Sequence, residues 1–476
     1  MRLMDLTETD NGQYNELQIK GVSCSSSNVK EGDAFVCIKG TALDGHDFAR
    51  AALDAGAAVV IAQRDTGVEK QIIVEDSRAM YAKMCANYFG NPARSLKIIG
   101  VTGTNGKTTI TYLLKSILEA AGHKTGVIGT IQNMIGDSIL PAKNTTPDAY
   151  ELHSLFSLMD KAGCEYVVME VSSHALDQKR VDGIRFAVGI FTNLTQDHLD
   201  YHKSIENYME AKRKLFTMCD KAIINADDPY GAKMAQGLSC ETILYSTMDD
   251  TSDFIAREVK YKADGVTFDL LGKGVIGRVR FKTPGKFSVY NAMAAGVAAI
   301  SIGLPFDGTV QSLSLANGVK GRAEVVPSGR DFTVIIDYAH TPDALTNVLN
   351  MLNQVKLGRL VTLFGCGGDR DKTKRPIMGE IAAKNSDFVI VTSDNPRTEE
   401  PSAIIEDILS GMKEAETPYI IIENRVNAID YAIENAKTDD IILLAGKGHE
   451  TYQILKHETI RLDEREVVAE ALKKLN

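Results

Sequence analysis

The sequence lacks the features that mark secreted, membrane-spanning and zinc-binding proteins. No apolar run in its 476 residues reaches the 18 or so needed for a spanning helix, and the first residues contain no apolar core of signal-peptide length. The seven cysteines are scattered and form no CxxC pair, which excludes zinc-ligand spacing and favours reduced thiols. We therefore expect a cytoplasmic protein without membrane insertion.

An excess of positive charge is also missing. The chain has 53 Lys and Arg against 63 Asp and Glu, a formal net charge of −10. A generic nucleic-acid binder needs a basic surface, so we expect no nucleic-acid partner. An anionic ligand would have to be held by local groups, because the overall field does not attract it. Hydrophobic residues make up 44% of the chain, as in a folded globular protein.

Length and local composition predict three domains. At about 150 residues per domain, the chain has room for roughly three. Stretches rich in Gly and Pro, FGNPARS at 89–95 and NGVKGRAEVVPSGRD at 317–331, supply two boundaries. We predict domains over residues 1–93, 94–325 and 326–476.

Strands and helices alternate along the whole chain, which predicts an α/β fold. Continuous apolar strands in the middle segment, at 96–103, 167–171, 188–193 and 222–228, are typical of a parallel sheet covered on both faces. The alternating pattern at 256–281 instead favours antiparallel strands. In the last segment, four apolar strands each end abruptly at polar and glycine residues. Ligands bind beyond such strand ends in open α/β sheets, so we expect one crevice there.

The strongest chemical signal is GVTGTNGKTT, residues 100–109, between a predicted strand and a predicted helix. Backbone N–H groups and the helix N-terminus can surround an anion. Lys107 would reach the β- and γ-phosphates of a nucleotide, and the Thr108 hydroxyl would bind Mg²⁺. Val101 occupies the position of the first glycine in the strict phosphate-loop pattern, and a simple Gly-Asn turn capping a helix is the alternative.

Two further strands end in side chains suited to such a site. Glu170 closes the strand VVMEV, where a magnesium or water-positioning carboxylate is expected. A bystander Glu before a helix capped by Ser172 is an equal alternative. The run TNLTQDHLDYH at 192–202 holds His198 among other titratable groups, and a metal-binding and a structural role both remain open.

The last segment offers charged groups of both signs at its strand ends. CGGDRDKTKRP at 366–376 places four basic residues behind a Gly-Gly turn, Arg397 follows an Asn-Pro turn, and GKGHE at 446–450 adds a cation and a carboxylate. Arg binds carboxylates through two parallel hydrogen bonds. A crevice with Arg, Asp and Glu suits a zwitterionic amino acid, although a solvated loop is the usual interpretation of a basic run.

Eight motifs in this order resemble the Mur ligases of peptidoglycan assembly across all three segments. They are TGTNGKTT, NTTP, EVSSHAL, FTNLTQDHLDYH, DYAHTPD, GCGGDRDKTKRP, DNPR and GKGHETY. The resemblance implies a small N-terminal α/β domain that binds a UDP-sugar. It also implies a central parallel sheet like that of P-loop ATPases and a C-terminal Rossmann-like domain that binds an amino acid.

The resemblance also implies a reaction and its partners. DNPR at 394–397 is similar to the forms that add meso-2,6-diaminopimelate, since lysine-adding relatives usually differ at the Arg. ATP would phosphorylate the D-glutamate γ-carboxylate of UDP-N-acetylmuramoyl-L-alanyl-D-glutamate. The amine of diaminopimelate would then attack the acyl phosphate and release phosphate. ATP and Mg²⁺ are the implied cofactors, and we expect a monomer.

Position by position, the resemblance implies the site residues. Catalytic roles fall to Lys107, Glu170, His198 and Lys212. ATP would contact Gly103, Thr104, Asn105, Gly106, Lys107, Thr108, Thr109, Asn291 and Asp337. Magnesium would be held by Thr108, Glu170, His198 and a carbamylated Lys212. The UDP-dipeptide would contact Ser26, Thr145, Thr146, Ser172, Gln178 and Arg180. Diaminopimelate would contact Arg370, Asp394, Asn395, Pro396, Arg397, Gly446 and Glu450.

Two observations qualify this set. Ser25-Ser26-Ser27 stands where the family usually has Asp-Ser-Arg, so only the Ser26 hydroxyl is kept. Without the resemblance, Lys212 would be interpreted as a surface lysine of a helix. The alternatives are a lysine-adding ligase, a ligase similar to folylpolyglutamate synthase, and a phosphate-loop switch that hydrolyses ATP without ligation. The last needs no amino-acid crevice.

Overall fold

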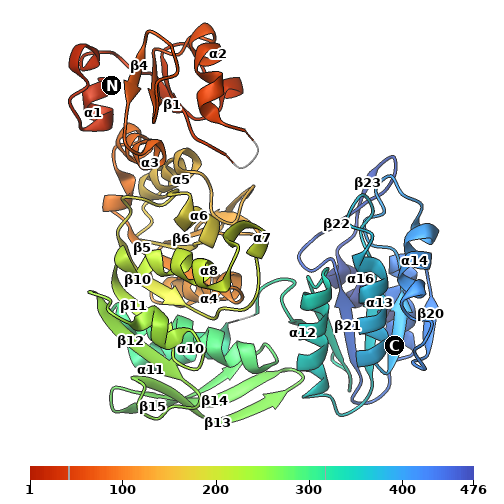
Figure 1. The fold of residues 1–476 in the computed structure, drawn as a ribbon. Helices are drawn as coiled ribbons and strands as arrows, with labels where there is room; N and C mark the ends of the chain where they lie inside the picture. Colours follow the sequence, from red (N-terminus) through yellow and green to blue (C-terminus); the bar gives the residue numbers. More distant parts are fainter. Residues whose placement is uncertain (41–42, 317, 476) are drawn as a thin grey trace. The chain divides into compact units, whose positions relative to one another are not determined.

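The computed structural model describes residues 1–40, 43–316 and 318–475, and these divide into two compact units (Figure 1). The first unit comprises Met1–Ile255 with Ala294–Thr309, and the second comprises Ala256–Met293 with Val310–Asn476. The division into three domains at 1–93, 94–325 and 326–476 stays a prediction.

The first unit begins with a small parallel sheet. Its strands lie in chain order, namely β1 (Gly21–Ser23), β2 (Asp33–Val36), β3 (Val59–Ala62) and β4 (Gln71–Ile73). β1, β2 and β3 are buried along their whole length. Three helices accompany the sheet: α1 (Leu3–Thr7), α2 (Ala49–Asp54) and α3 (Ser77–Tyr88).

A larger sheet fills the rest of the first unit. Within this unit, the order of its strands is β12-β11-β10-β5-β9-β6-β7-β8. The bounds are β5 (Lys97–Thr102), β6 (Thr125–Ile128), β7 (Asn133–Ile135), β8 (Ser138–Leu140), β9 (Tyr166–Glu170), β10 (Phe186–Phe191), β11 (Cys219–Asn225) and β12 (Glu241–Ser246). All neighbours from β12 to β6 are parallel, whereas β7 and β8 are antiparallel additions.

The register of this sheet brings three chain segments to one edge. Phe191 of β10 pairs with Thr102 of β5, and Val101 of β5 pairs with Glu170 of β9. Because the carboxyl ends of parallel strands meet at the same edge, the segments after β5, β9 and β10 lie side by side. The helices of this unit are α4 (Lys107–Ala120), α5 (Ala149–Lys161), α6 (Ser173–Asp177), α7 (Leu199–His202), α8 (Ile205–Arg213) and α9 (Gly231–Ala235).

The second unit contains an antiparallel hairpin and a six-stranded sheet. The chain passes into this unit within β13 (Phe254–Lys262). β14 (Gly265–Gly272) pairs antiparallel with β15 (Val275–Phe281), as predicted for 256–281. The sheet order is β16-β17-β21-β18-β19-β20. Its bounds are β16 (Glu324–Val326), β17 (Thr333–Asp337), β18 (Leu360–Phe364), β19 (Phe388–Val391), β20 (Tyr419–Ile421) and β21 (Ile441–Ala445).

The six-stranded sheet is parallel apart from β16, and helices cover both faces. One core cluster joins it to α12 (Pro342–Asn353), α13 (Lys374–Asn385) and α14 (Pro401–Ser410). A second cluster joins it to α15 (Arg425–Glu434) and α16 (Glu464–Lys474). The remaining elements are the hairpin β22 (Tyr452–Ile454) and β23 (Thr459–Arg461), with α10 (Lys286–Ser301) and α11 (Phe306–Leu315).

The fold confirms the predicted α/β class with parallel sheets. Every apolar strand predicted in the middle and last segments is present, because each is a continuous run that a two-sided core requires. The seven cysteines are free thiols. Within the described ranges, no helix combines the length and the apolar character needed to cross a membrane.

Candidate active site

The segment between β5 and α4, predicted to be a phosphate loop, forms a tight turn. Gly103 (φ +146°) and Gly106 (φ +91°) both adopt left-handed backbone conformations, which glycine adopts without strain. A Cβ at Gly103 would also collide with the Thr192 hydroxyl. Lys107 opens α4 at the end of this loop, and its Nζ donates to the carbonyls of Gly103 (2.9 Å) and Thr104 (2.8 Å). The predicted arrangement of loop, lysine and helix N-terminus is therefore present.

The exit of β10 braces the phosphate loop from the side. The backbone N–H of Thr104 donates to the Asn193 carbonyl (2.9 Å), and that of Asn105 donates to Asn193 Oδ1 (3.0 Å). Thr192 Oγ1 donates back to the Asn105 carbonyl at 2.6 Å. These contacts explain why Thr-Asn follows the apolar strand, and none of the three involves a charged side chain.

Glu170 lies at the end of β9 and is almost fully buried, with 1% of its surface exposed. Its Oε1 accepts from Thr108 Oγ1 and from the Thr130 N–H, each at 2.9 Å, and its Oε2 accepts from Thr130 Oγ1 at 3.1 Å. A hydroxyl and a carboxylate next to a helix N-terminus are hard oxygen ligands of the kind that Mg²⁺ requires. The Thr108–Glu170 pair thus fits a magnesium ion.

Lys212 lies on α8, yet it is buried with 1% exposed surface. Its Nζ donates to the Gly103 carbonyl at 2.8 Å, the same oxygen that Lys107 contacts, and lies 4.3 Å from the Tyr208 ring centroid. Burial, reinforced by the charge of Lys107, holds the pKa of Lys212 well below its usual value. The interpretation of Lys212 as a surface residue is wrong, because tertiary packing turns that face of α8 toward the loop.

His198 immediately precedes α7, has a left-handed backbone conformation (φ +52°) and keeps about half of its side chain exposed. Its ring lies 4.8 Å from His174 and 6.1 Å from Tyr208, measured between centroids. Tyr208 therefore has His198 and Lys212 as neighbours. Among the residues that the structure describes, no three His, Cys, Asp or Glu side chains form a metal-holding group, so the role of His198 in metal binding stays a prediction.

A pocket of about 720 Å³ lies in the first unit and includes two of the predicted substrate residues, Gln178 and Arg180. Arg180 Nη1 donates to the Thr146 carbonyl (2.8 Å), and Thr146 Oγ1 donates to the Glu170 carbonyl (2.9 Å). Thr146 Oγ1 also contacts Ser172. The predicted residues therefore form a continuous path from the pocket to Glu170.

Sequence reasoning missed several residues of this pocket. They include Lys39, Arg78, Asn144 and Tyr201. Arg78 Nη2 donates to the Lys39 carbonyl at 2.6 Å, which joins α3 to the segment after β2. The predicted contact Ser26 lies in a short 3₁₀ helix (Ser26–Asn28), and Cys24 rather than Ser26 lines the pocket. A contact of Ser26 with the uridine-sugar stays a prediction.

In the second unit, the segments after β18 and β19 pack together around Arg397. This residue has a left-handed backbone (φ +53°), and its Nη1 donates to the Gly368 carbonyl at 2.8 Å. The Gly368 N–H in turn donates to the Asn395 carbonyl (2.9 Å). A Cβ at Gly368 would collide with the Pro396 carbonyl, so the Gly-Gly turn permits this close approach.

Ion pairs of the buried Arg375 connect the same part of the second unit. Arg375 is fully buried, and its guanidinium donates to both oxygens of Glu399 (2.8 and 3.0 Å) and to Asp407 (2.8 Å). Glu399 also accepts from the Asp369 N–H at 2.7 Å. Hydrogen bonding from Arg375 lowers the pKa of Glu399 to about 2. Arg375, one of the four basic residues of the predicted loop, therefore pairs with carboxylates of the protein itself.

Four predicted amino-acid-binding residues meet in the segments that follow β19 and β21. Asn395 Nδ2 donates to Glu450 Oε2 at 2.9 Å, and the backbone of Gly446 lies against Asp394, so that a Cβ there would be 2.6 Å from Asp394 Oδ2. Asp394 and Asn395 are buried. Arg370 lies apart on the exposed surface of the segment after β18, where its Nη1 donates to the Asp369 carbonyl.

The two predicted nucleotide contacts of this unit are half-buried. Asp337 ends β17, and its Oδ2 accepts from the Ala323 N–H at 2.7 Å. Burial raises the pKa of Asp337, against the opposing effects of this hydrogen bond and of Arg322. Asn291 lies on α10. Sequence reasoning missed Arg322, whose guanidinium lies 5.3 Å from the Tyr338 ring centroid next to Asp337.

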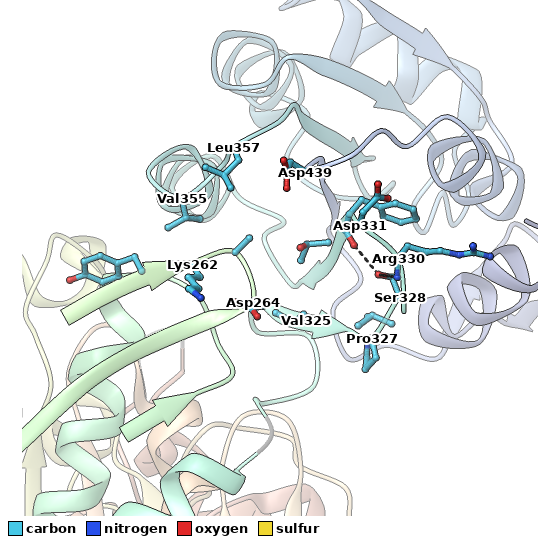
Figure 2. Close-up of a pocket in the computed structure, with 15 residues that line it drawn as sticks. Lys262, Asp264, Val325, Pro327, Ser328, Arg330, Asp331, Val355, Leu357 and Asp439 are labelled. Atoms are coloured by element: carbon cyan, nitrogen blue, oxygen red, sulfur yellow. Dashed lines mark hydrogen bonds between the residues drawn. The ribbon is translucent and has the colours of Figure 1, made fainter. Parts of the chain in front are cut away.

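The second unit also contains a pocket, which lies away from these groups. It has a volume of about 680 Å³, and the residues lining it include Lys262, Asp264, Arg330, Leu357 and Asp439 (Figure 2). It lies near the beginning of β17, at the opposite end of that strand from Asp337. None of the predicted site residues lines it.

Comparison with family models finds three matches in chain order. The model described as "Mur ligase family, catalytic domain" matches residues 18–89, "Mur ligase middle domain" matches 101–299, and "Mur ligase, glutamate ligase domain" matches 321–448. Together they cover most of the chain and include the phosphate loop, Lys212 and the segments that contain Arg397 and Gly446.

Curated relatives and solved structures agree with these matches. A protein of Caldanaerobacter subterraneus subsp. tengcongensis named UDP-N-acetylmuramoyl-L-alanyl-D-glutamate--2,6-diaminopimelate ligase is 47% identical over 99% of both chains. A similarly named protein of Clostridium acetobutylicum is 47% identical over 96% of both. A solved structure titled as a ligase of the same name is 32% identical, with TM-score 0.77 over 100% of this chain and 99% of that one. The MurF ligase of Thermotoga maritima, solved with ADP, shares the fold at 21% identity, TM-score 0.59 and coverage of 96% and 98%.

Proposed function

This chain belongs to the Mur ligase family, and we propose that it joins meso-2,6-diaminopimelate to UDP-N-acetylmuramoyl-L-alanyl-D-glutamate at the expense of ATP. The product would be a precursor of peptidoglycan. The observation that supports this substrate most directly is the Asp394–Arg397 turn, which presents an arginine beside buried acidic and amide groups. The relatives at 47% identity, which cover nearly the whole chain, carry the same activity in their names.

The proposed first step takes place at the phosphate loop. The γ-carboxylate oxygen of the substrate D-glutamate attacks the γ-phosphorus of ATP, ADP leaves, and an acyl phosphate forms. Lys107 and the N–H groups at the start of α4 stabilise the charge on the transferred phosphoryl group. Thr108 and Glu170 would hold Mg²⁺, which when bound neutralises phosphate charge. Without this activation, a carboxylate is a poor acyl donor.

Lys212 is proposed to act as a carbamate in this step. A lysine reacts with CO₂ through its neutral amine, losing a proton and forming an N–C bond, and burial favours that neutral form. The product carries a negative charge, which is favoured beside the cation Lys107, and its oxygens can bind a metal ion, whereas a second ammonium would be repelled. The carbamate N–H can still donate to the Gly103 carbonyl, as the amine does at 2.8 Å. A carbon-13 NMR signal from labelled bicarbonate, present in the native chain and absent from Lys212→Met, tests this assignment.

The proposed second step uses groups of the second unit. Arg397 would bind the carboxylate at the far end of diaminopimelate through parallel charge-assisted hydrogen bonds. Asp394 and Glu450 would accept from its ammonium group, while Asn395 donates to Glu450 and holds it in place. The free amine then attacks the acyl carbon, and phosphate leaves from a tetrahedral intermediate. Lysine lacks the second carboxylate and would leave Arg397 without an anion.

The proposal extends to the surroundings in which the protein works. We infer a monomer in the cytoplasm, where ATP and the nucleotide-linked peptide are available, with no nucleic-acid partner. The net charge of −10 supports the last point.

Formation of the UDP-linked tripeptide tests the proposed function. Purified protein is incubated with ATP, Mg²⁺, the UDP-dipeptide and meso-diaminopimelate, and the product is identified by mass spectrometry. We expect tripeptide, ADP and phosphate in equal amounts, and none of them when any one substrate is omitted. ATP hydrolysis that proceeds without the amino acid and the UDP-dipeptide would instead support the nucleotide switch.

A further inference from the structure

Lys447 is a fully buried lysine in the middle of the residues proposed to bind the amino acid. It follows Gly446 at the end of β21, in a segment whose other residues were considered as ligand contacts. A buried ammonium is costly unless it is paired and hydrogen-bonded. The partners of Lys447 therefore indicate what this charge does.

The Nζ of Lys447 contacts three of the proposed ligand-binding side chains. It lies 3.1 Å from Glu450 Oε2, 3.2 Å from Asn395 Oδ1 and 3.7 Å from Asp394 Oδ1. The ammonium donates to Glu450 and Asn395, and the Asp394 carboxylate, beyond hydrogen-bond distance, completes an ion-pair cluster around it. Since Lys447 is also wholly inaccessible, it acts on a ligand only through its neighbours.

The amide of Asn395 shows how these neighbours are ordered. Its Oδ1 accepts from Lys447 and from the Ile454 N–H (2.9 Å), while its Nδ2 donates to Glu450 Oε2 (2.9 Å). Each polar atom of the amide has a partner that matches only one orientation. Lys447 thereby helps to fix the orientation of Asn395 and, through it, the position of Glu450.

Charge balance leads to the same conclusion. Asp394 and Glu450 contribute two negative charges at the ends of β19 and β21, and Asp394 is only 6% exposed. Lys447 compensates for one of these charges from the protein side. One net negative charge then remains for a single ammonium group of the ligand, beside the cation Arg397. This balance suits one end of an amino acid that bears one ammonium and one carboxylate.

We propose that Lys447 is the positioning residue of the amino-acid subsite, orienting Asn395 and Glu450 and setting the subsite's net charge without touching the substrate. This inference rests on the proposed function, because it concerns the subsite for diaminopimelate. Its effect should be confined to that substrate, since none of its three partners belongs to the phosphate loop or to the pocket that contains Arg180.

The test compares steady-state kinetics of the full chain and of Lys447→Met, with phosphate release as the signal. The variant keeps the side-chain length and removes the charge. We expect kcat/KM for diaminopimelate to fall by about 30-fold or more, mainly through KM. KM for ATP and for the UDP-dipeptide should stay within about twofold. The matched control is Lys456→Met, which removes an exposed lysine paired with Glu400 and should change nothing.

The outcomes separate this inference from the proposed function. An unmutated chain that forms no tripeptide from diaminopimelate overturns both. If it does form tripeptide, an unchanged KM for diaminopimelate in Lys447→Met overturns the positioning role alone, as does an equal rise in KM for all three substrates. Thermal unfolding shows whether the variant folds. If it does not fold, Lys447→Gln, which keeps an N–H donor but no charge, replaces it, and the same changes in kcat/KM and KM are expected.

Discussion

Different interactions hold the two proposed parts of the site. The phosphate-loop region of the first unit surrounds residues 103–109, and the amino-acid region of the second unit contains residues 394–397 and 446–450. Around the loop, Glu170 accepts only from hydroxyl and backbone groups, and Thr192 and Asn193 brace the backbone. In the second unit, ion pairs hold the loops, with Arg375 on Glu399 and Lys447 on Glu450. The first region leaves its two lysines close to one carbonyl, whereas the second neutralises its charges internally.

Under the proposed function, the first region carries out the reaction and the second sets the selectivity for the amino acid. Backbone N–H groups and hydroxyls suit a phosphoryl group, whose charge changes position during transfer. Fixed guanidinium and carboxylate groups instead recognise one arrangement of charges in a ligand. Changes in the first region should therefore abolish turnover with any amino acid. Changes in the second should alter which amino acid is used and how tightly it binds.

The largest effect is expected from Lys107→Ala, which removes the cation from the phosphate loop. Phosphate release should fall by about 1,000-fold, because the transferred charge loses its main side-chain partner. Lys161→Ala, at the exposed end of α5, serves as the control. Retention of more than about a tenth of the rate, a loss below ~1.4 kcal/mol, would contradict the phosphate-loop assignment.

Lys212→Ala should reduce turnover by about 100-fold, with any amino acid, if the carbamate supplies a metal ligand. Added short carboxylates should restore part of the rate by replacing the missing oxygen. Lys214→Ala removes an exposed lysine two residues further along the chain, paired with Asp177, and should be near normal. A fully active Lys212→Ala protein would show that the buried amine is only structural.

Arg397→Ala should affect one substrate alone. We expect KM for diaminopimelate to rise by about 30-fold, since the far carboxylate loses a bidentate partner. Arg397→Lys should not restore it, because an ammonium cannot copy the planar guanidinium. KM for ATP should be unchanged in both, and Arg461→Ala, at an exposed ion pair, is the control. A parallel rise in KM for ATP would remove the distinction between the two regions.

The smallest effect concerns stability in acid. The pKa of Glu399 in the folded chain is about 2, below its ordinary value of 4.5. Its carboxylate therefore stabilises the fold above about pH 4.5, and this contribution is lost as the pH falls toward 2. With allowance for solvent screening, Glu399→Gln should cost about 1–2 kcal/mol at pH 7 and less at pH 3.

Denaturant unfolding at the two pH values measures this difference. Glu400→Gln, which changes the neighbouring carboxylate paired with Lys456, should show a smaller dependence on pH, because this ion pair is exposed and screened by solvent. Equal losses of stability for Glu399→Gln at pH 7 and pH 3 would mean that charge is not what holds the loops of the second unit.

The sequence predicts most of what depends on local pattern. The strands ending at Thr102, Glu170, Phe191 and Ala445 are continuous apolar runs, and the phosphate loop is read from its glycines and Lys107. Lys212 could not be placed in this way, because its burial depends on how α8 packs. Only the family resemblance singled it out.

Ion pairs between residues far apart in the chain could not be predicted from the local sequence either. Arg375 pairs with Glu399 and Asp407, which lie 24 and 32 residues further along the chain. In the sequence, Arg375 was one of four similar basic residues, and nothing nearby distinguished it from the exposed Arg370. Lys447 stood between the predicted contacts Gly446 and Glu450, but its complete burial follows only from the packing of the segments after β19 and β21.

The relative kcat/KM of the unmutated protein for meso-diaminopimelate and for L-lysine tests the central claim most directly. Both are measured by phosphate release with saturating ATP and UDP-dipeptide. A site with a fixed guanidinium should reject the analogue that lacks the carboxylate, so we predict a preference for diaminopimelate of up to about 10⁴-fold. Comparable values for the two amino acids would contradict the assignment of the second region as the source of selectivity.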